Sequence, residues 1–241
     1  AASTVRGNLA ATATTGNMTD SGALTIAGTS SFTTSANNAT IALDTTTNAF
    51  TGAVTITTND NSGTDADVTI DGGTTALILA ASTIDGDLTV RSGNASGITD
   101  SGTVTVGGNL TATTDANSGV INLGTLAVDG TVQLTTNGTG NATVVNDAGL
   151  TFAASTVGGN FAATATTGNV THGSGGALSV TGTSSFTTSA NNAYIALSYQ
   201  TNAFTGAVSL NTTGSDGFAR IDGGTTALDI AASSVGGWLM L

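Results

Sequence analysis

The chain has 241 residues, of which 7% are charged and 39% are hydrophobic, and it contains no proline and no cysteine. Its formal net charge of −12 argues against nucleic acid or an anionic membrane surface as a partner, because both require a basic surface. The lack of cysteine excludes disulfides, thiolate catalysis and cysteine-ligated metals. Disorder is also excluded, because it requires low hydrophobicity combined with high charge. No apolar run reaches the roughly 18 to 20 residues that span a bilayer, so we expect no membrane insertion.

One eight-residue phrase recurs along the chain. It reads Ala-Ser-Ser/Thr-Val/Ile-x-Gly-x-Leu/Phe and begins at Ala2, Ala81, Ala154 and Ala232, at steps of 79, 73 and 78 residues. A fixed period of this kind is the mark of a repeat architecture. We therefore predict one domain, 1–241, made of three large repeats (about 1–80, 81–153 and 154–231) and the start of a fourth (232–241).

A smaller unit, an aliphatic or aromatic residue followed by any residue and glycine, recurs inside each large repeat. Most of its glycines lie 21 to 24 residues apart, but once per large repeat the step lengthens to 34, 29 or 31 residues. The sequence leaves open whether each longer step holds an enlarged coil or an extra compact one.

Apolar residues alternate with small or polar ones, which predicts strands with one buried face. No window keeps the spacing of an amphipathic helix. Gly-Asn, Asp-Gly-Gly and Asn-Asn clusters between the alternating stretches supply turns. In chain order, the predicted strands include 24–26, 41–43, 68–70, 77–79, 104–106 and 121–123.

Units this short cannot bury their own apolar face, whereas stacked units can. We therefore predict an all-β fold, a right-handed parallel β-helix (β-solenoid). Roughly ten to twelve coils would form a rod about 50 Å long. The predicted stacked core includes Val5, Leu9, Ile84, Leu88, Val157, Phe161 and Val235, and the predicted tight corners are Gly7, Gly86, Gly159 and Gly237.

Few residues are able to carry chemistry. His172 is the only histidine and stands in a Gly-rich stretch that we expect to be an exposed turn. With no Lys, Cys or Glu in the chain, we predict no catalytic residues, no cofactor and no enzyme activity. The densest acidic stretch offers oxygen ligands of the kind that Ca²⁺ prefers, although it matches no EF-hand spacing. Its candidate ligands are Asp60, Asp65, Asp67 and Asp71, and the alternative is a solvated loop.

Two polar patterns suggest further roles. Thr-rich strands such as 11–14 and 111–114 would suit an ice-binding face, but the Thr pairs do not recur at one position of every coil. Threonine also favours strand surfaces by propensity alone. Asn8, Asn109 and Asn160 each follow a motif glycine, and we predict that these side chains stack as amide ladders.

The repeated Val-x-Gly-x-Leu phrases, the Gly-Asn turns and the Thr/Ala/Asn/Gly-rich, Cys-free composition resemble the filamentous-haemagglutinin-type repeats of large bacterial adhesins, including autotransporter passengers. The resemblance covers essentially the whole chain. It implies a right-handed β-helical stalk on the bacterial surface or outside the cell that mediates adhesion or biofilm cohesion. No receptor-binding or secretion motif accompanies it, and the absence of lysine departs from the pattern.

The expected function is that of a structural and adhesive repeat segment. The expected partners are the chain itself, through end-to-end or lateral association, or glycans of a host or neighbouring cell. Two alternatives remain: a self-assembling extracellular filament subunit, and an ice- or glycan-binding β-solenoid.

Overall fold

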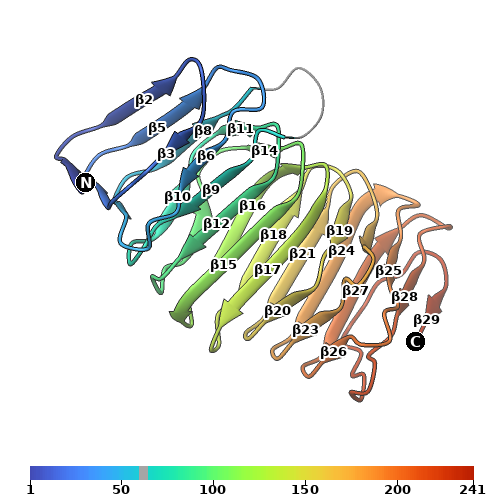
Figure 1. Ribbon diagram of the computed structural model, residues 1–241. Helices are drawn as coiled ribbons and strands as arrows, with labels where there is room; N and C mark the ends of the chain where they lie inside the picture. The colour runs from blue at the N-terminus through green and yellow to red at the C-terminus, as the bar shows by residue number, and fades with distance from the viewer. Residues whose placement is uncertain (60–64) are drawn as a thin grey trace.

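A computed structural model describes residues 1–59 and 65–241. The chain forms a rod of parallel strands stacked in about 11 turns, and the described residues contain no helix (Figure 1). The predicted all-β solenoid and its number of coils are therefore confirmed. No helix long and apolar enough to cross a membrane occurs within these two ranges.

The strands form three parallel sheets that run along the rod. The three-stranded sheet contains β1 (Ser3–Val5), β4 (Leu24–Ile26) and β7 (Ala49–Phe50). The 12-stranded sheet contains β2 (Leu9–Ala13), β5 (Ser30–Thr34), β8 (Val54–Thr57), β10 (Leu77–Leu79), β11 (Ser82–Ile84), β13 (Ile98–Asp100), β14 (Val104–Val106), β16 (Ile121–Val128), β18 (Ala142–Asn146), β21 (Phe161–Ala165), β24 (Ser184–Asn191) and β27 (Val208–Thr213). The 14-stranded sheet contains β3 (Met18–Thr19), β6 (Ile41–Leu43), β9 (Val68–Asp71), β12 (Leu88–Ser92), β15 (Leu110–Asn117), β17 (Thr131–Asn137), β19 (Leu150–Phe152), β20 (Ser155–Val157), β22 (Val170–His172), β23 (Leu178–Val180), β25 (Ile195–Leu197), β26 (Ala203–Phe204), β28 (Ala219–Ile221) and β29 (Leu239–Met240).

Each strand pairs with its counterpart one turn further along the chain. Leu9 pairs with Ser30 in β5, and Ser30 pairs with Val54 in β8. Over the whole rod a turn uses 19 to 27 residues. Alternate residues point inward, and the strand β5 shows the resulting alternation of buried and half-buried positions. Backbone ladders thus run along the rod and enclose one continuous apolar core.

The core contains six phenylalanines that are at most 1% exposed. Four of them form a packed group, in which Phe186 contacts Phe152, Phe161 and Phe204 edge to face at ring-centroid distances of 6.5, 5.6 and 6.0 Å. Edge-to-face packing suits the quadrupoles of the rings. The buried phenylalanines are Phe32, Phe50, Phe152, Phe161, Phe186 and Phe204.

The pairing explains the longer glycine steps, which hold neither an enlarged nor an extra coil. Val54 pairs with Leu79, so residue 77 is level with Gly52, and Gly86 lies nine residues beyond it. In the same way, the pairing of Thr131 with Thr151 shows that Gly159 lies nine residues beyond the position level with Gly130. The pairing of Val208 with Ile230 shows that Gly237 lies nine residues beyond the position level with Gly206. Each longer step is therefore one full turn plus part of the next.

As a result, the recurring phrase changes sides. Its first and third copies lead into β2 and β21 of the 12-stranded sheet. Its second and fourth copies lead into β12 and β29 of the 14-stranded sheet. Seven successive pairings connect β2 with β21, and seven connect β12 with β29. A large repeat thus spans about three and a half turns. The first and third repeats present equivalent strands on the same side of the rod, about 33 Å apart.

Candidate functional site

The predicted core residues lie in the interior, with differences between the middle and the ends of the rod. Ile84, Leu88, Val157 and Phe161 are at most 1% exposed. Val5 and Leu9 in the first coil and Val235 in the last are partly buried against the same core. End coils are covered on one side only, which is why these three side chains keep some contact with solvent.

Three of the four predicted corner glycines are required by close approach of neighbouring coils, and none of the four has a positive φ. A Cβ added to Gly86 would lie 2.7 Å from the Ala66 carbonyl carbon of the preceding coil, and one on Gly159 would lie 2.4 Å from the Thr139 carbonyl oxygen. A Cβ on Gly237 would come 3.0 Å from a backbone oxygen. Gly7 has nothing within 4 Å of its Cβ direction, because no coil precedes it among the described residues.

The asparagines that follow the motif glycines do not stack on one another as amide ladders, and that prediction is wrong. Each side-chain oxygen instead accepts a hydrogen bond from a backbone N–H one turn on. The acceptors Asn8, Asn109 and Asn160 lie 3.0, 2.8 and 2.9 Å from the N–H groups of Thr29, Thr131 and Thr183. Asn8 and Asn160 precede β2 and β21 of the 12-stranded sheet, seven turns apart, whereas Asn109 precedes β15 of the 14-stranded sheet, so none of the three lies next to another. Their role is to satisfy backbone donors at the corners.

The candidate Ca²⁺ ligands are not brought together as one site by the described residues. Asp60 lies outside them, and within the described ranges no three His, Cys, Asp or Glu side chains are grouped to hold a metal ion. Asp67 accepts a hydrogen bond of 2.8 Å from the backbone of Asp87. Asp71 accepts one of 2.7 Å from Gly73. Burial raises the pKa of the Asp71 carboxyl, although the Gly73 hydrogen bond and Arg91 act in the opposite direction.

His172 ends β22 and packs edge-on against Tyr199, with ring centroids 5.1 Å apart and planes at 87°. Its Nε2 atom is buried without a hydrogen-bond partner among the described residues. The half-buried ring corrects the expectation of an exposed turn residue. The contact connects the end of β22 with the segment that follows β25.

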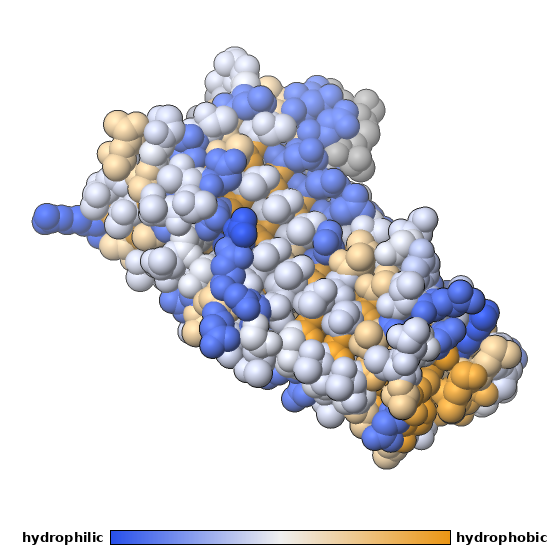
Figure 2. Space-filling view, turned by 60° about the horizontal axis from the view of Figure 1, so that its bottom comes forward, coloured by the Kyte–Doolittle hydropathy of each residue, from blue (hydrophilic) through white to orange (hydrophobic). Residues whose placement is uncertain are grey.

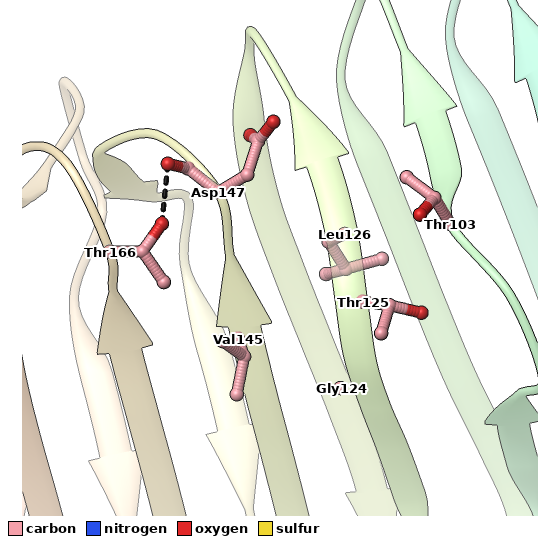
Figure 3. Close-up of a pocket in the computed structure, with 7 residues that line it drawn as sticks. All are labelled: Thr103, Gly124, Thr125, Leu126, Val145, Asp147 and Thr166. Atoms are coloured by element: carbon pink, nitrogen blue, oxygen red, sulfur yellow. Dashed lines mark hydrogen bonds between the residues drawn. The ribbon is translucent and has the colours of Figure 1, made fainter.

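A shallow hollow opens on the 12-stranded sheet (Figure 3). It is lined by short side chains and one carboxylate, that of Asp147, and Thr166 Oγ1 donates a hydrogen bond to the Asp147 carbonyl oxygen. The side chains that surround it are spread over several strands and do not converge on one point. Its lining residues are Thr103, Gly124, Thr125, Leu126, Val145, Asp147 and Thr166.

One column of threonines recurs more regularly than the sequence predicted. Five outward positions in successive coils are aligned by strand pairing, and all five are threonine. The outward positions two residues before them include Ala10, Ser31 and Ala81, so a pair of threonines is complete only at 55 and 57 and at 103 and 105. The column contains Thr12, Thr33, Thr57, Thr83 and Thr105.

A cluster that the sequence analysis missed lies on the 14-stranded sheet of the last three coils. Tyr194 stacks on Phe218 with ring centroids 4.6 Å apart and planes at 5°, and Phe218 stacks on Trp238 at 4.4 Å and 2°. Arg220 points outward two residues after Phe218, and Met240 two residues after Trp238. We call these five residues the aromatic face. Every tyrosine, the only tryptophan and the only phenylalanine outside the core lie on this side.

The signal for the aromatic face was present in the sequence. Aligning 40–45 with 194–199 replaces Thr40 by Tyr194 in two otherwise similar stretches, and aligning 67–73 with 218–224 replaces Asp67 by Phe218. Strand pairing is what places Tyr194 and Phe218 next to each other on the sheet. The sequence does not show this pairing, so it does not show that the aromatic residues are neighbours.

The chain belongs to a family described as repeats of unknown function (DUF5649), which matches residues 1–57, 65–123 and 139–211. No curated protein and no solved structure matches the chain. The family thus establishes a repeat protein, and the structure establishes its solenoid form.

Proposed function

We propose that this chain is a structural and adhesive repeat segment of a bacterial cell-surface or extracellular protein, of the filamentous-haemagglutinin type. The observation that carries the proposal is the unbroken stack of about 11 turns around a single core. Ladders of backbone hydrogen bonds run along the axis, so that bending the rod strains many of them together. The surface is polar and weakly charged, with 7% charged residues in the chain. We propose no catalytic activity, no cofactor, and partners that are either copies of the chain or cell-surface glycans.

The rod is tested by negative-stain electron microscopy of the purified chain over a dilution series. We expect particles about 50 Å long, the length of eleven strand spacings. The variant Val157→Asp should shorten the rods or lower their melting temperature, because it buries an unpaired charge. Round particles, or a melting curve of Val157→Asp that matches the parent, would contradict the proposal.

A second candidate function is a subunit of an end-to-end filament. Hydrophobic surface gathers at the end of the rod where the last coils lie (Figure 2). The large hydrophobic residues that are exposed within the described ranges are Trp238, Leu239, Met240 and Leu241. In the same micrographs, fibres that lengthen along the rod axis and persist on dilution would support this candidate, and isolated short rods would oppose it.

The third candidate, ice binding, is favoured by the threonine column at Thr12, Thr33, Thr57, Thr83 and Thr105. Its hydroxyls recur at one strand spacing, about 4.8 Å. Thermal hysteresis of the chain, compared with the variant Thr57→Lys in the middle of the column, tests this candidate. Equal hysteresis in both would exclude the column as the ice-binding surface.

A further inference from the structure

The first and third large repeats provide an internal comparison, because long stretches of them are identical. The segments 10–17, 30–39 and 71–77 recur unchanged at 162–169, 184–193 and 222–228. Seven pairings separate β6 from β25 and β9 from β28. Equivalent residues therefore lie on the same side of the rod, about seven strand spacings or 33 Å apart.

On the 14-stranded sheet the two repeats carry opposite chemistry. Pairing of β6, β9 and β12 aligns the outward positions 40, 67 and 87, and pairing of β25, β28 and β29 aligns 194, 218 and 238 in the same way. Asp67 and Asp87 of the first set stand at the positions equivalent to those of Phe218 and Trp238 in the second. We call Asp67 and Asp87 the acidic edge.

Other replacements on this side act in the same direction. Asp20, which accepts a hydrogen bond of 2.9 Å from Thr45, is replaced by His172, and Thr45 is replaced by its ring partner Tyr199. Asp44 is replaced by Ser198. The third repeat has thus exchanged carboxylates for rings on one side of the rod.

The aromatic face is suited to a protein partner that carries carboxylates. Its rings are stacked along the rod, so that they turn their edges to the solvent, and ring edges carry the positive part of the quadrupole. Arg220 is exposed, and no carboxylate of the described residues lies within ion-pair distance of it. The nearby Asp222 directs its carboxylate to its own Gly224 amide at 2.8 Å. Tyr, Trp, Phe, Met and Arg are also the residues enriched in protein interfaces.

The acidic edge has the complementary chemistry. Asp67 Oδ1 accepts from the Asp87 N–H at 2.8 Å, and Asp87 Oδ1 accepts from the Asn109 N–H at 2.7 Å. These bonds fix each carboxylate at the corner of its coil. The second oxygen of each has no hydrogen-bond partner among the described residues, and the Asp67 side chain is exposed.

We propose that two copies of this chain associate side by side and antiparallel, with the aromatic face of each on the acidic edge of the other. Both patches lie on the same side of the rod and are seven turns apart, so one two-fold axis midway between them makes both contacts at once. Such an isologous interface closes and yields a dimer. The side chains of each patch lie on successive turns and are spaced by one turn. They therefore stay in register when the two rods run in opposite directions. This interface deepens the proposed structural role and rests on the rod shape.

Sedimentation velocity over a concentration series tests the dimer, with the emission of Trp238, the only tryptophan, as a second signal. We expect a concentration-dependent dimer whose formation shifts the Trp238 emission to shorter wavelength and weakens with added salt. Arg220→Thr installs the residue found at the equivalent position 69 and should weaken association more than tenfold, because each dimer loses the contact twice. Arg6→Thr removes the same charge from an exposed position in the first coil and should leave association unchanged.

Asp67→Asn with Asp87→Asn removes both carboxylates of the acidic edge while keeping the acceptor oxygens. This double variant should weaken association as Arg220→Thr does, because each dimer again loses the contact twice. An equimolar mixture with Arg220→Thr should recover association in part, because one of the two contacts is intact in the mixed dimer. Recovery in the mixture is the result that a merely structural effect of either change would not produce.

Three results would overturn the interface: a monomer at all concentrations, association that both variants leave unchanged, or growth along the rod axis in micrographs. A monomer whose Trp238 emission shifts on addition of polygalacturonate would also overturn it, in favour of an acidic glycan. Micrographs of the same samples separate this failure from failure of the proposed function, because single rods overturn the interface only and round particles overturn the rod.

Discussion

The packed phenylalanines allow a quantitative test of the stacked core. Phe186 and Phe50 are both fully buried, but Phe186 has three ring neighbours, whereas Phe50 has one, Phe32, at 5.9 Å. Replacing a buried phenylalanine by alanine costs about 3–5 kcal/mol. Each aromatic pair adds about 0.5–1.5 kcal/mol beyond burial. Phe186→Ala should therefore destabilise the chain by about 1–3 kcal/mol more than Phe50→Ala, since it loses two more pairs.

Urea denaturation of the two variants and the parent, followed by circular dichroism, measures this difference. The two substitutions delete the same atoms from equally buried sites, so side-chain chemistry is matched. Equal losses, or a larger loss for Phe50→Ala, would refute the argument that ring contacts between successive coils stabilise the core beyond the area they bury.

Three further predictions concern single positions. Gly159→Ala should destabilise the chain by about 1–3 kcal/mol, because its Cβ would lie 2.4 Å from a backbone oxygen. Gly7→Ala is the control, and it should change the melting temperature little because nothing lies within 4 Å of the added Cβ. Equal effects of the two variants would contradict the close approach of coils. Asn146→Ala should cost about 1.5–4.5 kcal/mol in urea denaturation, because its buried amide makes three hydrogen bonds, of 2.8, 3.0 and 2.7 Å; a neutral effect would show that these bonds are not needed. The raised pKa of Asp71 means that the folded chain holds this proton more tightly than the unfolded chain, so its contribution to stability is full at low pH and is lost as pH rises through the folded pKa. Asp71→Asn, which keeps the acceptor, should accordingly be more stable than the parent at pH 7 and equal to it in acid, with Asp222→Asn as the matched control; thermal melts in which Asp71→Asn loses stability at neutral pH would reverse the sign of this argument.

Local alternation was sufficient to predict the strands. Stretches such as 41–43 and 104–106 became β6 and β14 within the predicted bounds, because inward and outward residues differ at every second position. Repetition then required stacking, since no coil buries its own apolar face. Both inferences rest on neighbours in sequence or on a simple period, and such information is present in one chain.

The sequence did not predict which sheet a residue occupies or which residues of neighbouring turns it pairs with. The step from Gly52 to Gly86 is one turn plus nine residues, which becomes evident only from the pairing of Val54 with Leu79. For the same reason Asn8 and Asn109 were expected to stack although they lie on different sheets. Residues that strand pairing aligns in successive turns are 19 to 27 positions apart, and this spacing varies from turn to turn. A variable spacing cannot be extrapolated from the sequence.

Because the first and third repeats are nearly identical, the few residues that differ between them are evidence of a role beyond the fold. Both repeats build the same coils, as the identical segments 30–39 and 184–193 show, so the fold alone does not require rings where the first repeat has Asp67 and Asp87. An outward ring costs solubility, and a rod made only for stiffness would keep the carboxylates that hold chains apart. Placing Phe218, Arg220 and Trp238 on the side that carries the acidic edge seven turns away gives the rod two complementary patches facing one direction. That arrangement is accounted for by a partner with the same two patches in reverse order, which is a second copy of the chain.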